Sequence, residues 1–249
     1  MKTIFVILLF LLFSTNQIWS QENKETRIPL LGEFAPQFTA ESTKGKITFP
    51  DDYVMKWKIL FSHPSDFTPV CSSEIIELAS IQEDFEKLET QLVVVSTDGL
   101  ASHVEWVTSL EAVKYKGKTT HKINFPLVAD DKLEVSKKYG MIHSYTGITR
   151  DVRGVFIIDP NDRIRAIFFY PSDVGRNIEE IKRTLIALQT SEKLNVLTPA
   201  NWKPGQDYLL HAPKSKAAAN DLLQKHDPDL YSLDWYFWLQ KARAQITTQ

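Results

Sequence analysis

The chain contains a single cysteine, and it lies where a strand-forming segment passes directly into a helix-forming one. Ile59, Leu60 and Phe61 form a short apolar run that is typical of a strand. After Cys71, apolar residues recur at helical spacing, at Ile75, Leu78, Ile81, Phe85 and Leu88. The segment therefore predicts a strand, a short loop and a helix in that order, which indicates an α/β arrangement around the cysteine.

The helix is expected to begin just before the cysteine. Thr68 followed by Pro69 is a helix-start signature, because a threonine oxygen can cap free amides and proline suits the first helical position. Cys71 is then the third helical residue, where unpaired N–H groups and the helix dipole favour a thiolate. The alternative is a buried structural cysteine. We prefer the reactive interpretation because the cap signature and the strand-to-helix placement are independent observations.

The segment from Pro64 to Cys71 reads PSDFTPVC and resembles the Pro-x-x-x-Thr-x-x-Cys motif of the peroxiredoxins. The preceding His63 and the run after Cys71 resemble the one-cysteine, peroxiredoxin-six-like branch of that family. Two later segments, Tyr170–Asn177 and Thr198–Gly205, also resemble this branch. The resemblance implies a thioredoxin-like core.

Apolar patterning along the chain independently predicts a mixed α/β sheet flanked by helices, with a C-terminal extension arm. Gln91–Asp98 is a nearly continuous β-branched run that is typical of a strand buried on both faces. Val152–Ile158 and Ile164–Tyr170 are expected to pair as a hairpin, since turn-forming residues separate them. Helices are predicted over Ala101–Val113, Leu133–Tyr139 and Asn177–Gln189.

Three parts are expected along the chain: a signal peptide over residues 1–20, a thioredoxin-like peroxidase domain over 28–190, and an arm and tail over 191–249. Lys2 precedes the apolar run Ile4–Phe13, which is too short to span a bilayer and is typical of a secretory signal peptide. Cleavage is expected after Ser20. The protein is therefore predicted to be exported, either secreted or periplasmic.

The tail contains an apolar and aromatic cluster between residues 230 and 239. Two interpretations are open: an amphipathic helix packed against the core, or the same helix packed against a partner. We prefer core packing.

Charge and cysteine content exclude several function classes. The net charge is -2 and there is no run of Lys or Arg, so no nucleic-acid partner is expected. A single cysteine allows neither an internal disulfide nor dithiol exchange. The histidines lack the spacing of metal ligands, so neither a metal nor a cofactor is expected.

The resemblance also implies the site residues around Cys71. Arg153 matches the active-site arginine of peroxiredoxins, with Arg150 as the nearby rival. Thr68 is expected to offer its hydroxyl to the peroxide, and Pro64 to shield the thiolate from water. Glu74 either holds the arginine in place or only complements the helix dipole.

The predicted function is a thiol-dependent peroxidase that reduces hydrogen peroxide and organic hydroperoxides through Cys71. The resulting sulfenic acid needs a thiol from another molecule, either a small thiol or a redoxin, because the chain has no second cysteine. A homodimer or a higher homo-oligomer is expected. Two alternatives are a cysteine hydrolase with His63 or His143 as its base, and a secreted redox-signalling or holdase protein that has kept the fold.

Overall fold

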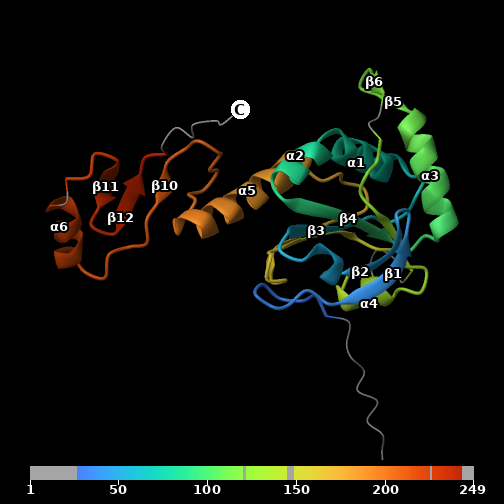
Figure 1. The fold of residues 1–249 in the computed structure, drawn as a ribbon, viewed down its shortest axis with the longest axis horizontal. Helices are drawn as coiled ribbons and strands as arrows, with labels where there is room; N and C mark the ends of the chain where they lie inside the picture. The colour runs from blue at the N-terminus through green and yellow to red at the C-terminus, as the bar shows by residue number, and fades with distance from the viewer. Residues whose placement is uncertain (1–26, 120–121, 145–148, 225, 243–249) are drawn as a thin grey trace, which may run out of the picture.

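The computed structural model describes residues 27–242, except 120–121, 145–148 and 225 (Figure 1). The predicted signal peptide lies outside the described residues. Within the described part of the chain, no helix is long and apolar enough to cross a membrane.

A seven-stranded mixed sheet forms the centre of the main body, in the order β2-β1-β7-β4-β3-β8-β9. Its strands are β1 (Phe38–Ser42), β2 (Gly45–Phe49), β3 (Trp57–Ser62), β4 (Thr90–Ser96), β7 (Leu127–Ala129), β8 (Arg153–Ile158) and β9 (Ile164–Tyr170). The pairs β3–β4 and β4–β7 are parallel, whereas the other neighbours are antiparallel. The predicted mixed sheet and the β8–β9 hairpin are therefore confirmed.

The helices of the main body follow the predicted order, with one difference. They are η1 (Asp51–Tyr53), α1 (Pro69–Ser80), α2 (Gln82–Lys87), α3 (Leu100–Ala112), α4 (Glu134–Lys138) and α5 (Ile178–Leu194). The apolar periodicity after Cys71 suggested one helix, but α1 and α2 are separate and Ile81 lies between them. A small hairpin of β5 (Lys114–Tyr115) and β6 (Lys118–Thr119) lies between α3 and β7.

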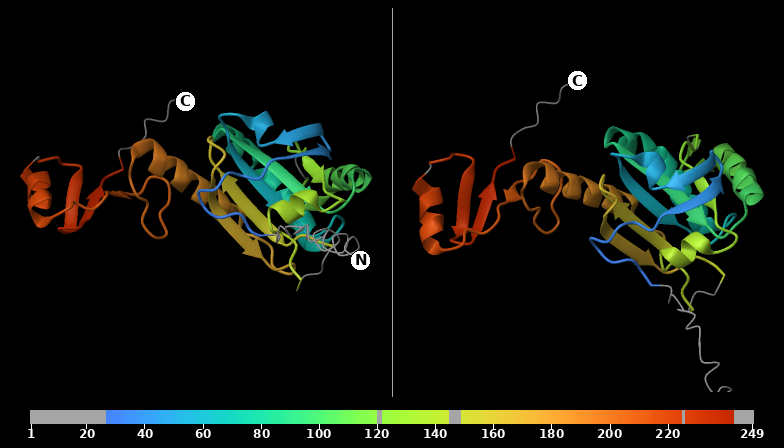
Figure 2. Two further views of the ribbon diagram at one scale, coloured as in Figure 1. Left: turned by 90° about the horizontal axis from the view of Figure 1, so that it is seen from below. Right: turned by 60° about the horizontal axis from the view of Figure 1, so that its bottom comes forward.

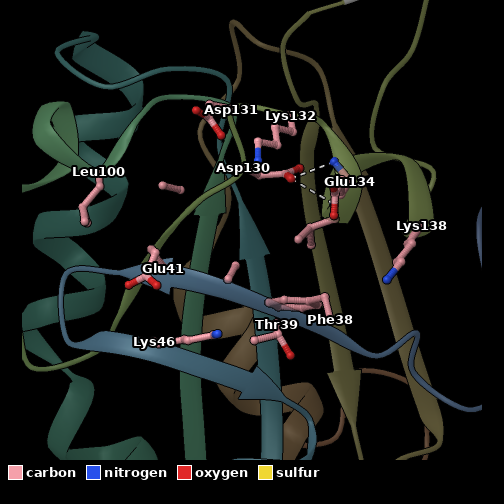
Figure 3. Close-up of a pocket in the computed structure, with 13 residues that line it drawn as sticks. Phe38, Thr39, Glu41, Lys46, Leu100, Asp130, Asp131, Lys132, Glu134 and Lys138 are labelled. Carbon is pink, nitrogen blue, oxygen red and sulfur yellow. Dashed lines mark hydrogen bonds between the residues drawn. The ribbon is translucent and has the colours of Figure 1, made fainter.

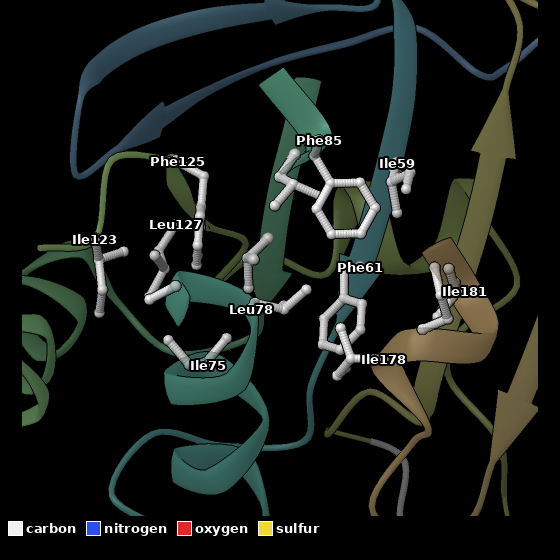
Figure 4. Packing of buried hydrophobic residues seen from close by; sticks show 14 of the residues in the cluster. Ile59, Phe61, Ile75, Leu78, Phe85, Ile123, Phe125, Leu127, Ile178 and Ile181 are labelled. Carbon is white, nitrogen blue, oxygen red and sulfur yellow. The ribbon is translucent and has the colours of Figure 1, made fainter. Parts of the chain in front are cut away.

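The sheet is buried on both faces, and successive residues of β3 serve opposite faces. Ile59 and Phe61 belong to a cluster formed with α1, α2, α3 and α5, where they lie with Leu78 and Ile178 (Figure 4). Leu60 belongs to the cluster on the other face, which includes residues of α4. The strand that precedes Cys71 is therefore held from both sides.

The C-terminal residues form a small lobe that α5 separates from the main body (Figures 1 and 2). The lobe contains α6 (Lys216–Gln224) and a three-stranded antiparallel sheet of β10 (Tyr208–Leu209), β11 (Leu230–Asp234) and β12 (Phe237–Gln240). An apolar cluster that includes Trp202 and Tyr208 packs where α5 meets the lobe.

The predicted amphipathic helix in the tail is wrong, because residues 230–240 form the β11–β12 hairpin. Aromatic residues favour strands, and here pairing with β10 supplies the partner that sequence periodicity alone does not show. Packing of the tail on the main core is also not observed. Trp238 is buried, but Leu233 and Tyr236 are 67% and 52% exposed.

Candidate active site

Cys71 is the third residue of α1, as the helix-start signature predicted. Its side chain is fully buried, which the signature did not predict. Thr68 occupies the N-cap position with extended backbone angles, and Pro69 is the first helical residue. The prediction that the Thr68 hydroxyl caps the helix is wrong. This hydroxyl donates a hydrogen bond to the carbonyl oxygen of Ser65 at 2.9 Å, so it stabilises the loop before the helix.

Arg153, at the start of β8, approaches the cysteine from the neighbouring strand. Its Nη1 lies 3.4 Å from Sγ of Cys71 and 2.7 Å from a carboxylate oxygen of Glu74. Its Nε and Nη2 both donate to the carbonyl oxygen of Ser172. Arg153 is 2% exposed, whereas the rival Arg150 is exposed. The structure therefore brings Arg153 to the thiol with an orientation fixed by three separate groups.

Glu74 is 3% exposed and joins two buried arginines. Besides Arg153, it accepts hydrogen bonds from the backbone N, Nε and Nη2 of Arg176 at 2.7–2.8 Å. Nη1 of Arg176 donates to the carbonyl oxygens of Ser62 and Gly154. Two guanidinium groups against one carboxylate leave a net positive charge beside Cys71.

Sequence reasoning did not select Arg176 as a site residue. Burial lowers the pKa of its guanidinium, which the partner Glu74 opposes, and the group also stacks 3.3 Å from the centre of the Phe61 ring. A signal was available, because Arg176 stands in Tyr170–Asn177, one of the segments that carried the family resemblance. An arginine next to a helix start is usually solvated, so its burial was not foreseen.

A buried cluster joins His63 and Asp66, in the loop between β3 and α1, with His103 of α3. Their possible ligand atoms all lie within 4.8 Å of one another, although the spacing of the histidines in the sequence does not predict this grouping. Asp66 accepts from the Ser102 hydroxyl at 2.7 Å and lies 2.8 Å from Nδ1 of His103. Nε2 of His103 faces the carbonyl oxygen of Val128. Asp66 and His103 therefore form a buried hydrogen-bonded pair whose polar atoms are satisfied by protein groups.

His63 is fully buried in this cluster and packs against Trp106, with ring centres 5.0 Å apart. Burial and the positive charges around it, first of all His103, lower the pKa of His63 well below its ordinary value. The ring is therefore neutral near pH 7. Pro64, the next residue, is also buried, in the loop that leads to Cys71.

A pocket of about 370 Å³ lies elsewhere, between β1 and the loop that leads into α4 (Figure 3). Its lining mixes acidic and basic side chains, and it contains none of the residues that surround Cys71. The buried Asp130 is occupied in capping α4, since it accepts from the backbone amides of Glu134, Val135 and Ser136. This pocket is therefore separate from the thiol chemistry.

The chemistry available at Cys71 is attack by a thiolate on an electrophile, with a fixed arginine to take up the developing negative charge. Together with the thioredoxin-like sheet, this defines the class of thiol-dependent peroxidases.

Comparisons with known proteins agree with this class. Residues 31–167 match the profile of the AhpC/TSA family, and residues 187–225 match the C-terminal domain of 1-Cys peroxiredoxin. A peroxiredoxin of Methanosarcina mazei is 46% identical over 215 residues, which cover 86% of this chain and 98% of that protein. A peroxiredoxin of Thermotoga maritima is 44% identical over 222 residues, which cover 88% of this chain and 100% of that protein.

Two solved structures are similar over most of the chain. A yeast mitochondrial 1-Cys peroxiredoxin has a TM-score of 0.75 and 34% identity, covering 86% of this chain and all of that one. A cysteine-to-serine mutant of peroxiredoxin 6 from Arenicola marina has a TM-score of 0.73 and 31% identity, and the match covers 87% of this chain and 100% of that one.

The chain belongs to the AhpC/TSA family of peroxiredoxins, and its resemblance to the one-cysteine branch is confirmed. It is a peroxidase with one cysteine. The alternative of a non-catalytic signalling or holdase protein has no support among these relatives, which carry the name peroxiredoxin.

Proposed function

We propose that the protein is an exported homodimeric peroxidase in which Cys71 reduces hydroperoxides and an external thiol regenerates it. The observation that carries the role of Cys71 is the 3.4 Å contact between its Sγ and Nη1 of a buried arginine. This contact stabilises a thiolate and leaves the cation beside the atoms that react.

In the proposed reaction, the thiolate of Cys71 attacks the terminal oxygen of a hydroperoxide. A sulfur–oxygen bond forms, the oxygen–oxygen bond breaks, and the leaving alkoxide or hydroxide takes up a proton from solvent. The products are a sulfenic acid and an alcohol or water. Arg153 stabilises charge on sulfur and on the leaving oxygen, and Thr68 offers its hydroxyl to the peroxide.

Two further residues support this step. Pro64 is buried in the loop before α1 and limits the access of water to the thiolate. Glu74 fixes Arg153 by a 2.7 Å ion pair between buried groups, which favours the first of the two roles considered for it.

The sulfenic acid requires a thiol from another molecule, because Cys71 is the only cysteine in the chain. The structure of the yeast relative concerns thiol resolution through the glutathione and thioredoxin systems. A small thiol or a redoxin is accordingly the proposed reductant here. Without one, repeated peroxide should convert Cys71 to sulfinic and sulfonic acid and stop turnover after about one equivalent.

Intact-mass analysis after stepwise addition of peroxide tests this function. We expect additions of one, two and three oxygens to Cys71, reversal of the first by added thiol, and loss of all three in Cys71→Ser. A dominant disulfide-linked dimer would instead indicate resolution between the cysteines of two chains. Absence of any oxidation under low peroxide would refute the peroxidase assignment.

A homodimer is supported by apolar side chains that one protomer leaves uncovered. Leu233 and Tyr236 of the lobe are more than half exposed, and so are Leu30, Leu31 and Phe34 near the start of the main body. Large exposed apolar side chains at these two places on the surface are available to pack against a second copy of the chain. Light scattering at micromolar concentration should give about twice the mass of one chain, and a monomer would contradict the proposal.

Export is supported by Lys2 and the apolar run Ile4–Phe13. Mass analysis of protein recovered from the growth medium or the periplasm should show cleavage near Ser20. Recovery of the intact chain from the cytosol would contradict export.

A further inference from the structure

The loop between β3 and α1 contains a residue in an unfavourable backbone conformation. Phe67 has a φ of 53°, in the left-handed region that bulky side chains avoid. Such a conformation costs about 1–3 kcal/mol and persists only where the surroundings enforce it. The ring itself is 54% exposed, so burial of the side chain does not explain it. The two residues that follow Phe67 are Thr68 and the first residue of α1.

The residue before Phe67 is held at both its backbone and its side chain. The backbone amide of Asp66 donates to Oδ2 of Asp98 at 2.8 Å, just after β4. Its carboxylate accepts from the Ser102 hydroxyl and contacts Nδ1 of His103, both in the first turns of α3. Two elements outside the loop therefore fix the position of Asp66.

The contact between Asp66 and His103 is charge-assisted. Nδ1 of His103 faces the Asp66 carboxylate at 2.8 Å, and Nε2 faces the carbonyl oxygen of Val128 at 3.1 Å. Both ring nitrogens of His103 therefore face oxygen acceptors, and the acceptor at Nδ1 is a carboxylate. Both side chains are almost completely buried, and hydrogen bonds of this kind are about twice as strong as neutral ones.

We propose that Asp66 and His103 are positioning residues for the peroxidase reaction of Cys71 proposed above. Their contact holds the left-handed turn at Phe67, and this turn directs the Thr68 hydroxyl and the first turn of α1 toward an incoming peroxide. Neither side chain touches the reacting atoms. Without the contact, Phe67 relaxes to a negative φ and Thr68 moves with it.

The test separates peroxide reduction from the general reactivity of the thiolate. Stopped-flow fluorescence follows oxidation of Cys71, with Trp106 as the reporter, since its ring lies 6.5 Å from that of Phe67 and its N–H donates to the Ser72 hydroxyl. In Asp66→Asn and His103→Gln, the rate constant with hydrogen peroxide should fall about 10- to 100-fold, the cost of a misplacement of about 1 Å. Alkylation by iodoacetamide needs only the thiolate. Its rate constant in each variant should therefore stay within about threefold of the value for the parent chain, or rise above it.

Two further variants distinguish a loss of positioning from a general loss of folding. Ser102→Ala removes one donor to Asp66 and should give a smaller loss in the same direction. Thr108→Val, on the same helix, is the matched control, because its hydroxyl donates to the Val104 carbonyl within α3. Circular dichroism confirms that each variant is folded.

A change at Phe67 tests the strain directly. Glycine adopts a positive φ at no steric cost. In a Phe67→Gly background, His103→Gln should therefore cost clearly less in peroxide rate than it does in the parent chain. Three results would overturn the assignment. In the variants, the rate constants with peroxide and with iodoacetamide could fall equally, or the peroxide rate constant could stay unchanged in Asp66→Asn and Ser102→Ala. The third is that His103→Gln lowers the peroxide rate constant as much in the Phe67→Gly background as in the parent chain. A parent chain that fails to react with peroxide would instead refute the peroxidase function itself.

Discussion

Replacing Glu74 by glutamine should destabilise the protein far more than the same change at a surface ion pair. Glutamine keeps the size of the side chain, removes its charge, and turns a donor toward one of two buried guanidinium groups. Glu74 is 3% exposed and accepts one hydrogen bond from Arg153 and three from Arg176. Removing one partner of a buried pair costs about 3–5 kcal/mol, because the remaining charge is left without compensation.

A domain of this size loses about 2–4 °C in Tm for each kcal/mol, so Glu74→Gln should melt roughly 6–20 °C below the parent chain. The matched control is Glu180→Gln, which breaks the pair with Arg183 on α5, where the two side chains are 39% and 28% exposed. Such exposed ion pairs contribute about 0–1 kcal/mol to the free energy of unfolding, so the Tm of this control should change little. Scanning calorimetry of the three proteins measures both shifts. Equal shifts in the two variants would refute the idea that Glu74 compensates buried charge.

Two further changes test the site and its surroundings. Arg153→Lys should slow oxidation of Cys71 by peroxide about 100-fold in stopped-flow measurements, because an ammonium group cannot hold Glu74 and the thiolate in one geometry; a larger loss in Arg150→Lys would mean that the wrong arginine is assigned. Burial raises the pKa of Asp151 well above its ordinary value. The folded chain thus keeps a proton that the unfolded chain loses near pH 4, and stability falls as pH rises from there to the folded-state pKa. Urea unfolding should show the stability of Asp151→Asn, relative to the parent, increasing from pH 4 to pH 8, and a constant difference would contradict this.

Local sequence signals predicted the main body well. The turn residues after Ile158 were enough to predict the β8–β9 hairpin, and Thr68 with Pro69 placed the start of α1 correctly. These features depend on neighbours in the chain, which a single sequence contains. The prediction that the Thr68 hydroxyl caps α1 was wrong, because the hydroxyl is oriented to donate to the Ser65 carbonyl and makes no cap hydrogen bond to the helix.

Contacts between distant parts of the chain were harder to predict. Glu74 and Arg176 are 102 residues apart, and only the fold shows that they meet. The same holds for Asp66 and His103, which are 37 residues apart. In the tail, the sequence contained the apolar residues but did not indicate their strand partner, because β10 pairs with β12 across a separation that no local pattern reveals.

The long helix α5 acts as a rigid spacer between the main body and the lobe (Figure 2). Its 17 residues span about 25 Å, at a rise of 1.5 Å per residue. Each residue also turns the helix by about 100°, so the length of α5 sets the rotational phase of the lobe as well as its reach. Loss of one residue near its exposed end would aim the lobe in another direction and separate Ala187 of α5 from Trp202 and Tyr208, with which it packs. Insertions in α5 should therefore be tolerated in evolution only near whole numbers of turns, such as about seven residues, while the loops at either end remain free to vary.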